Sequence, residues 1–492
     1  MIISRSKINF FILENMSLTG RVARNTIIQV IGKILGTVLG LIVVGLLTRY
    51  LGTAGYGHYT TIIAYLGFFS VIADLGLYLI VVREISKKEA DPQKVLGNVF
   101  SIRIIFAGVI LALAAFIAFF LNYPLIVKQG ILLGTLSFLF VALNQVMVGI
   151  FQKKLAMYKV ALGELIGRIV LLALVAWFIS LNYSLLFIIL AVVCGSLANF
   201  IVVYILAQKY VKIKFRFNFE YWKYILKETW PLAISVVLNL LYFRLDTVFL
   251  SLIKPASDVG LYGACYKILE VLVTLPNLFV GLVLPILSYW AFLNRDKFIE
   301  IFRRSFDFII LITIPLVTGG FILARPLIIL IGGQEFAAAA PIFQILIFGV
   351  GFLFLGSLSG HTIVAINKQR KMVWGYLSVA VLGIILYLTL IPFLSYYGAA
   401  IGTVVTEFSI MIIGYYIIIK TMRFKLPWRV FVKSLAASFA MAGFLYAARD
   451  FNLFIQLTVG LVIYLAVSYL LKSFTRKEVL EVIKIGKEKK NG

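Results

Sequence analysis

The strongest constraint on the fold of this chain is a series of fourteen long hydrophobic segments between about residues 26 and 472. Most are near the ~20 apolar residues, about 30 Å of helix, that are needed to cross the core of a bilayer. Backbone in lipid must hydrogen-bond to itself, so segments of this length are predicted to be helices. We therefore predict an all-α, polytopic membrane protein with about 14 transmembrane helices. The predicted spans are 26–49, 58–82, 97–121, 126–151, 157–181, 184–208, 228–252, 259–289, 305–325, 339–365, 372–394, 397–419, 430–448 and 452–471.

The net charge of +26 comes from basic residues that gather in every second gap between the spans. The positive-inside rule therefore places both termini in the cytoplasm, in a multi-pass protein of the plasma membrane. Topology and contact with anionic membrane lipids explain this charge, and no loop is long enough to form a basic domain that binds nucleic acid. The basic gaps contain, for example, Arg83, Lys87, Lys88, Lys94, Lys153, Lys154, Lys209, Lys212, Lys214, Arg216, Lys420, Arg423 and Lys425, whereas the opposite loops contain Arg49, Lys128, Lys254, Arg325 and Arg449.

An internal repeat predicts two halves of the same orientation. Gly57-His58-Tyr59 matches Gly260-Leu261-Tyr262, and an even number of spans separates the two segments. Two six-helix bundles related by a pseudo-two-fold axis along the membrane normal, with two C-terminal helices added, are therefore expected; such repeats occur in transporters, with the substrate path between the halves. The predicted parts are a cytoplasmic N-tail (1–24), an N-lobe (25–208), a cytoplasmic linker (209–227), a C-lobe (228–420), spans 13 and 14 (430–471) and a basic cytoplasmic tail (472–492).

Cysteine and histidine are too sparse for a metal site. Cys194 and Cys265 both lie inside spans, and His58 and His361 are far apart in the sequence. We expect neither a disulfide framework nor a metal nor a cofactor. The N-terminal residues lack the h-region of a cleavable signal peptide, and translation could start at Met1 or at Met16.

Several short segments are notable in the order in which they occur: Leu47–Gly57, Ala73–Leu77 with Arg83-Glu84-Ile85, Arg244-Leu245-Asp246, Val259–Tyr262, Gly332–Phe336 and Gly398–Gly402 with Thr406-Glu407. This ordered set resembles Wzx-type polysaccharide and oligosaccharide flippases of the multidrug/oligosaccharidyl-lipid/polysaccharide exporter superfamily. The resemblance covers about residues 16–472, and it implies alternating access by two lobes around a central cavity. It also implies a substrate that is an oligosaccharide linked to a polyprenyl lipid, delivered from the cytoplasmic to the outer leaflet, and no enzymatic activity.

Charges inside a span are costly, so each is a candidate for function. In the first span, Lys33 lies beside a stripe of Gly32, Gly36 and Gly40 that would let another helix approach closely. Lys33 and Asp74 both lie roughly 12 Å above the cytoplasmic boundary at 1.5 Å per residue. They could neutralise each other, or Lys33 could bind a pyrophosphate group with Asp74 as its partner when the cavity is empty.

In the second half, Arg244, Asp246 and Lys267 are predicted to lie in the outer third of the membrane. Lys267 and Glu270 have the spacing of a pair within one helix. A network joining these charges could lock spans 7 and 8, or the cations could receive a negative headgroup passed from the first half. Glu164 and Arg168 are predicted to form a structural pair within span 5. The candidate substrate-binding residues are Lys33, Arg49, Arg244, Lys267, Asn239 and Tyr242, and the candidates for ion coupling or charge pairing are Asp74, Asp246, Glu270 and Glu407.

Three other functions stay open. A cation-coupled drug or metabolite antiporter of the same fold would favour acidic over basic cavity residues, and a lipid II flippase would share the fold. A polyprenol-dependent membrane glycosyltransferase is less favoured, because the outer loops are short and carry isolated acids. No GxxxxGK[ST] phosphate loop is present for ATP, so a proton or sodium gradient or the membrane potential is the expected energy source. Proteins of polysaccharide assembly are possible partners.

The orientation can be tested with cysteines introduced into loops. A cysteine at Ser184 or Ser257 should react with a membrane-impermeant thiol reagent added outside intact cells, because both positions lie in loops poor in basic residues. A cysteine at Lys212 or Lys425 should react only after the cells are permeabilised. The opposite labelling pattern would invert the predicted topology.

Overall fold

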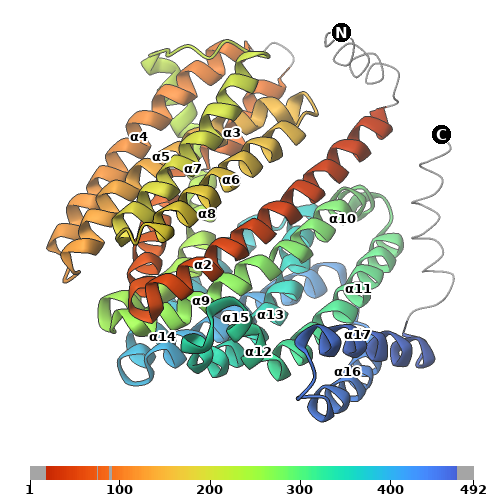
Figure 1. The fold of residues 1–492 in the computed structure, drawn as a ribbon. Coiled ribbons are helices and arrows are strands. Elements are labelled where there is room, and N and C mark those ends of the chain that lie inside the picture. The colour runs from red at the N-terminus through yellow and green to blue at the C-terminus, as the bar shows by residue number, and fades with distance from the viewer. Residues whose placement is uncertain (1–17, 75, 88–90, 474–492) are drawn as a thin grey trace, which may run out of the picture. The chain divides into compact units, whose positions relative to one another are not determined.

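The computed structural model describes residues 18–74, 76–87 and 91–473, and it describes side chains for all of these except 18–27, 78–79 and 230–243. This part of the chain contains sixteen α-helices, one short 3-10 helix and no strand (Figure 1). The prediction of an all-α polytopic membrane protein is confirmed. The predicted N-tail up to residue 17 and the predicted basic tail from residue 474 lie outside the described residues.

Twelve helical segments in the described part are long and apolar enough to cross a membrane. The segment Ile28–Asp74 covers most of the predicted spans 26–49 and 58–82, and Ala256–Leu293 contains the predicted eighth span. The predicted seventh span lies in the helix α8 (Phe219–Ile253), whose side chains are not described between 230 and 243. The number fourteen and the two-fold relation between halves therefore stay predictions.

The described residues up to Leu46, together with Tyr65–Val237, form one compact unit. Its core is a cluster of buried apolar side chains from α3, α4, α5 and α7, which includes Val99, Met147 and Phe151. Ile213, from the segment after α7, joins the same cluster. The helices of this first unit are α2 (Leu18–Asp74, in part), α3 (Leu77–Ser86), α4 (Pro92–Phe120), α5 (Leu125–Lys153), α6 (Tyr158–Ser180), α7 (Leu185–Gln208) and the beginning of α8.

Residues 47–64 and the described residues from Leu238 onward form the second compact unit. Its helices are the middle of α2, the end of α8, α9 (Ala256–Leu272), α10 (Thr274–Leu293), α11 (Arg295–Ile322), α12 (Ala324–Gly332), η1 (Gln334–Ala339), α13 (Ala340–Ala365), α14 (Gln369–Leu394), α15 (Tyr396–Met422), α16 (Arg429–Ala447) and α17 (Leu453–Leu470). The predicted N-lobe included 47–64, so the observed boundary differs there.

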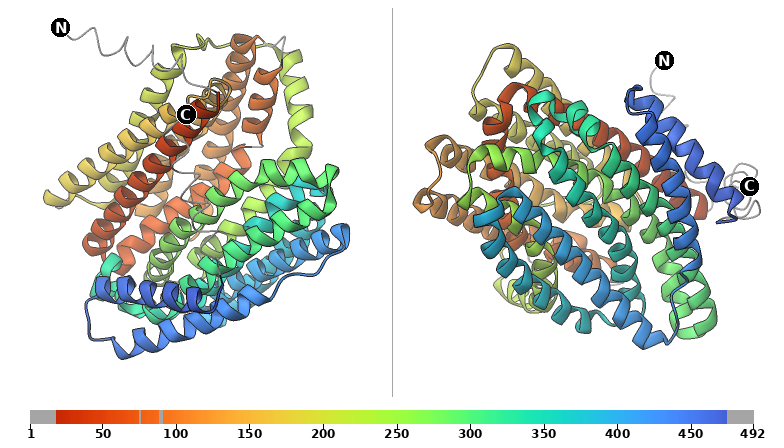
Figure 2. Two further views of the ribbon diagram at one scale, coloured as in Figure 1. Left: turned by 90° about the vertical axis from the view of Figure 1, so that its right-hand side faces the viewer. Right: turned by 90° about the horizontal axis from the view of Figure 1, so that it is seen from below.

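The last two helices are part of the second unit rather than a separate body. Figure 2 shows α16 and α17 in dark blue beside each other. Tyr464 of α17 contacts Ser434 of α16 at 2.7 Å and donates a hydrogen bond of 2.7 Å to the carbonyl of Leu311 in α11. A shared apolar cluster that includes Met441 and Leu445 completes the packing.

Two predicted spans are interrupted, and local chemistry explains one of the breaks. The eighth ends as α9 at Leu272 and resumes as α10 at Thr274. Pro276 has no backbone N–H to donate, and its ring would clash with the carbonyl of residue 272, four positions earlier. The second predicted span ends as α2 at Asp74, and α3 begins at Leu77 after Gly76, which has a φ of 69°.

A further kink lies inside α2 at Gly52, where φ is 63° and ψ is −175°. These angles are accessible to glycine and strained for any other residue. The kink separates the predicted first and second spans within one continuous helix. It lies in the part of α2 that belongs to the second unit.

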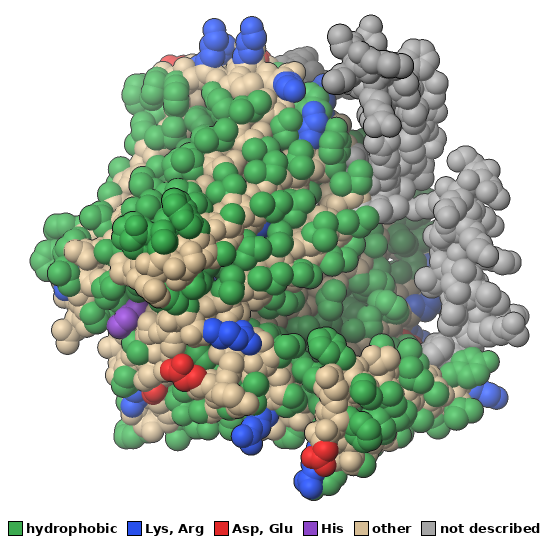
Figure 3. All heavy atoms as spheres, in the orientation of Figure 1, with side chains coloured by type: hydrophobic (Ala, Val, Ile, Leu, Met, Phe, Trp, Pro, Cys, Tyr) green, Lys and Arg blue, Asp and Glu red, His purple; other side chains and the backbone are tan. Residues whose placement is uncertain are grey.

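Large apolar side chains cover much of the outer surface of the helices, as expected where lipid replaces water. Figure 3 shows one face on which hydrophobic side chains predominate, with Lys and Arg few and scattered. Phe116, Phe120, Phe393, Tyr446 and Leu470 are among those that are more than half exposed. In water such a surface would aggregate, so its extent agrees with a protein that spans a membrane.

The two segments that define the internal repeat cross each other within the second unit. A Cβ added to Gly57 would lie 1.7 Å from the carbonyl oxygen of Ala256, and one added to Gly260 would lie 2.0 Å from that of Thr53. Only glycine allows α2 and α9 to approach this closely.

Gly57→Ala and Gly260→Ala should each destabilise the protein by about 1–3 kcal/mol, because the added methyl group pushes two backbones apart. The measurement is thermal unfolding of the purified protein in detergent. Gly281→Ala is the matched control, since nothing lies within 4 Å of a Cβ at that position of α10. Equal melting temperatures for all three variants would contradict the proposed close crossing.

Candidate transport site

The glycine stripe of α2 receives the side chain of an arginine from α6. A Cβ on Gly36 would lie 3.1 Å from Nε of Arg168, and a Cβ on Gly40 would lie 2.6 Å from its Nη1. Gly32 meets the Cβ of Ala161 in the same way, at 3.0 Å. Arg168 lies about 15 Å from the start of α6 by the rise of an α-helix, near the middle of this span. The predicted stripe therefore does admit a second helix, and it also holds a cation in place.

Neither Arg168 nor Lys33 has a hydrogen-bond or ion-pair partner within the described part of the chain. Lys33 is exposed one turn of α2 before Gly36, and Arg168 is partly exposed. Glu164 is also exposed and makes no ion pair with Arg168, so the predicted structural pair within α6 is absent. Two cations without a bound carboxylate thus lie along one stretch of the α2–α6 contact.

Asp74 is paired with Arg103 of α4, a residue that the sequence analysis did not single out. The guanidinium is 1% exposed and uses all its N–H groups. Its Nε donates to the carbonyl of Ala142, its Nη1 to those of Ala73 and Asp74, and its Nη2 to the Asp74 carboxylate and to Gln145 Oε1. Asp74 is the last residue of α2, so Arg103 also satisfies carbonyls that this helix end leaves unpaired.

The predicted pairing of Lys33 with Asp74 is therefore wrong, because Asp74 already has its cation. The signal for Arg103 was available, since an arginine six residues into the predicted span 97–121 is as costly as any other charge in lipid. The sequence could not show which carboxylate it meets. That depends on how α2, α4 and α5 are rotated against one another.

In the second unit, Arg244, Lys267 and Glu270 form one ionic cluster. Nη2 of Arg244 lies 2.9 Å from Glu270 Oε1, and Nζ of Lys267 lies 2.7 Å from Oε2. One carboxylate thus serves two cations, and the cluster carries a net charge of +1. The side chains of Arg244 and Lys267 are 35% and 41% exposed, so both cations remain accessible.

Asp246 lies two residues from Arg244 but faces the interior of the unit, with 1% exposure. Its carboxylate accepts hydrogen bonds from the Tyr262 hydroxyl at 2.6 Å, from the Thr403 hydroxyl at 3.1 Å and from the N–H and hydroxyl of Thr247. Such a group ties α8, α9 and α15 together. The opposite facing of Arg244 and Asp246 agrees with their positions on the helix.

Arg49 caps the C-terminal end of α12. Its Nη1 and Nη2 donate to the carbonyls of Ile331 and Leu330, each at 2.8 Å. Glu335 binds the beginning of a helical stretch of α2. Its Oε1 accepts a hydrogen bond from the backbone N–H of Thr53, directly after the Gly52 kink. Cations suit the end of a helix and anions its beginning. Two of the segments that resembled the flippases thus cap each other's helices.

The structure describes the surroundings of the remaining predicted site residues in less detail. Glu407 is 3% exposed and lies near the middle of α15. The side chains of Asn239 and Tyr242 lie outside the described residues. No group of three His, Cys, Asp or Glu side chains that could hold a metal occurs where the structure is described.

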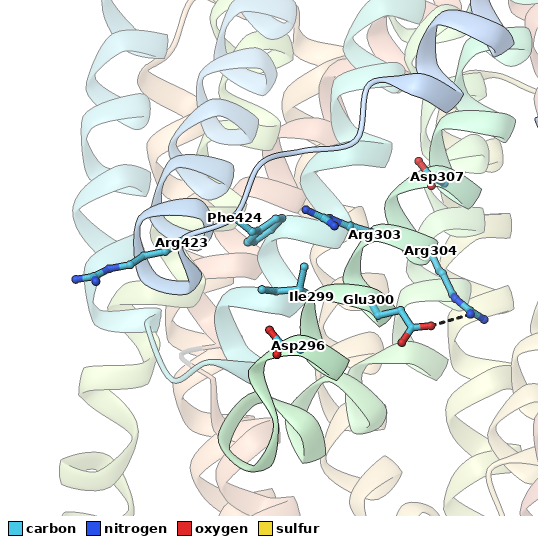
Figure 4. Close-up of a pocket in the computed structure, with 8 residues that line it drawn as sticks. All are labelled: Asp296, Ile299, Glu300, Arg303, Arg304, Asp307, Arg423 and Phe424. Carbon is cyan, nitrogen blue, oxygen red and sulfur yellow. Dashed lines mark hydrogen bonds and ion pairs between the residues drawn. The ribbon is translucent and has the colours of Figure 1, made fainter.

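A pocket of about 470 Å³ lies where α11 begins and α15 ends (Figure 4). Its charged groups largely neutralise one another or bind the backbone: Arg304 pairs with Glu300 at 2.7 Å, and Arg303 donates to the carbonyl of Lys425 at 3.2 Å. None of the predicted site residues lines it. The lining residues are Asp296, Ile299, Glu300, Arg303, Arg304, Asp307, Arg423 and Phe424.

Removing Arg103 alone should be far more damaging than removing both members of its pair. Arg103→Leu leaves a partly buried carboxylate and unpaired carbonyls, and should lower the free energy of unfolding by about 3–5 kcal/mol. Arg103→Leu with Asp74→Leu should regain a large part of that loss. Thermal unfolding in detergent measures both.

Arg304→Ala is the control for this comparison, because its pair with Glu300 is exposed at both side chains (69% and 59%) and is worth about 1 kcal/mol or less. A double variant that is no more stable than Arg103→Leu would show that the carbonyl contacts, and not the ion pair, dominate.

Comparison with known proteins gives one family and one fold. A family model described as "Polysaccharide biosynthesis protein" matches residues 22–290. The capsular polysaccharide biosynthesis protein CapF of Staphylococcus aureus is 26% identical over 292 residues, which cover 58% of this chain and 73% of CapF.

Among solved structures, the lipid II flippase MurJ in an inward closed conformation is similar with a TM-score of 0.76 and 18% identity. The match covers 91% of this chain and 99% of MurJ. An inward-facing multidrug resistance transporter of the MATE family has a TM-score of 0.62 and 13% identity, covering 81% of this chain and 99% of its own. These likenesses show that the fold is shared with transporters.

Proposed function

This chain belongs to the polysaccharide biosynthesis protein family, and from that premise we propose that it moves a lipid-linked oligosaccharide across the membrane. The proposed substrate is a polyprenyl diphosphate that carries a sugar chain, transferred from the cytoplasmic to the outer leaflet for the assembly of a surface glycan. The chain is a multi-pass membrane protein whose relatives by fold are transporters, so the work is movement rather than chemistry. Both termini are proposed to lie in the cytoplasm.

The observation that carries the proposal is the pair of cations along the α2–α6 contact. Arg103, Arg244 and Lys267 have bound carboxylates, whereas Arg168 and Lys33 have none in the described structure. A cation in the middle of a span is costly unless water or an anion reaches it. A diphosphate group supplies that anion, and the planar guanidinium of Arg168 can hold two of its oxygens at once.

The glycine stripe also fixes the position of the Arg168 side chain before an anion binds. Because Gly36 and Gly40 have no side chains, the Arg168 side chain lies directly against α2, with Nε beside Gly36 and Nη1 beside Gly40. Less side-chain freedom is then lost when an anion binds. The cluster of Arg244, Lys267 and Glu270, with its net charge of +1, is proposed as a second place where the headgroup rests.

Ion coupling is proposed to involve one of the acids predicted within the spans, which are Asp74, Asp246, Glu270 and Glu407. Glu407 is almost fully buried near the middle of α15, where gain of a proton or sodium ion would cancel a costly charge. The drug antiporter alternative would instead require acids, rather than cations, to face the substrate.

Arg168→Ala and Lys33→Ala should each reduce glycan export by about tenfold or more, the loss expected when a charge-assisted hydrogen bond of about 1.5–3 kcal/mol is removed. Arg168→Lys should retain part of the activity because the charge remains. Export is measured as surface glycan in cells that lack their own copy of the gene, at matched protein abundance. Arg244→Ala and Lys267→Ala belong in the same series.

Lys128→Ala is the control, because Lys128 is a cation of the first unit that donates to the Phe119 carbonyl near a helix end. It should export normally. Normal export by both Lys33→Ala and Arg168→Ala would remove the basis for a diphosphate substrate and leave these cations with a role in packing.

A further inference from the structure

The segment that joins α7 to α8, together with the first residue of α8, carries three phenylalanines that are more than half exposed within the described structure. Phe215 is 62% exposed, Phe217 is 60% exposed and Phe219 is 74% exposed. This segment, residues 212–219, is called the strap here; it runs along the top of Figure 1 in yellow-green. It belongs wholly to the first unit.

The strap is held on α4 by its backbone. Its phenylalanine rings each have one aromatic neighbour, Phe100 of α4 for Phe215 and Trp222 for Phe217 and Phe219, and their remaining surface is exposed. The N–H of Arg216 donates to Ser101 Oγ at 3.2 Å, and the N–H of Asn218 donates to Asn98 Oδ1 at 2.9 Å. Both acceptors are buried on α4. N–H groups two residues apart that point the same way indicate extended backbone, in which alternate side chains share a face. Phe215 and Phe217 therefore point to one side together.

Close packing fixes the strap further. A Cβ added to Gly97 of α4 would lie only 2.4 Å from the carbonyl oxygen of Lys214 in the strap. Ile213, at the beginning of the strap, is buried in the core and exchanges two hydrogen bonds with the Gln208 side chain. The aromatic side chains are thus presented on a fixed support rather than on a loose loop.

The charge around the strap complements an anionic surface. Between residues 209 and 228 the chain has six basic residues against two acidic ones. One of the acids, Glu228, is paired with Arg83 at 2.9 Å. The basic residues are Lys209, Lys212, Lys214, Arg216, Lys223 and Lys227.

We propose that the strap is a lipid-binding surface that inserts Phe215, Phe217 and Phe219 into the headgroup region of the anionic cytoplasmic leaflet. The strap follows directly on the end of a membrane-spanning helix, α7, so the boundary of the bilayer lies within its reach. Aromatic side chains with flanking lysines are the combination that binds an anionic interface, by burial of apolar area and by attraction of charge. The strap then anchors the first unit to one leaflet, whatever substrate the protein carries.

The test places a nitroxide label at Phe217 in the full-length protein. Cys194 and Cys265 are replaced by alanine, Phe217→Cys is labelled, and the protein is reconstituted in vesicles of phosphatidylcholine with phosphatidylglycerol. Power saturation compares the access of oxygen, which concentrates in lipid, with that of a water-soluble nickel chelate. Lys154→Cys, an exposed position in the loop between α5 and α6, is the matched control.

The label at residue 217 should shift toward oxygen access, whereas the label at 154 should favour the nickel chelate. In vesicles of phosphatidylcholine alone, or when Lys212, Lys214, Lys223 and Lys227 are all replaced by glutamine, the shift at 217 should be smaller. The single label leaves the supporting hydrogen bonds intact, and thermal unfolding confirms that each variant folds.

Three outcomes would overturn the proposal. Nickel access at 217 equal to that at 154 would place the strap in water. Shielding from both reagents would show that protein, such as a second copy of the chain, covers it. An oxygen shift that does not depend on anionic lipid or on the four lysines would remove the anionic leaflet as its partner.

Discussion

Helix ends that lie in or near the bilayer must find hydrogen-bond donors for their last carbonyls, and in this protein arginines supply them. Arg103 donates to the carbonyls of Ala73 and Asp74 where α2 ends, and Arg49 donates to those of Leu330 and Ile331 where α12 ends. Water cannot take this role inside lipid, so an unmet carbonyl there costs several kcal/mol. The ends of α2 and α12 are therefore stabilised by these two side chains.

The same requirement explains why short segments far apart in the sequence act as one structure. Arg49 and Thr53 lie on either side of the Gly52 kink in α2, and their partners lie on α12 and in η1. Gly57 and Gly260 bring α9 against the same stretch of α2. As a result, residues 47–64 pack with the second unit although the chain before and after them packs with the first.

Charge pairing divides the intramembrane cations into two kinds. Arg103 is fully enclosed and has every donor occupied, which is the pattern of a structural residue. Arg168 and Lys33 lie along a helix contact with no carboxylate bound, and Arg244 and Lys267 share one carboxylate while remaining partly exposed. This division supports the proposed diphosphate substrate better than the total positive charge does, because most of that charge follows from topology.

The sequence by itself determined the class of fold, since long apolar segments have only the helix available to them in lipid. It also determined which residues bear an unusual cost, because a charge within a span is visible in the sequence alone. Only the tertiary structure decided what each charge meets. Asp74 binds Arg103 rather than Lys33, Arg168 lies against glycines rather than Glu164, and Arg49 caps a helix at residues 281 and 282 positions further along the chain. The physical reason is that a partner is fixed by the rotation and packing of several helices together, and no local periodicity records those angles.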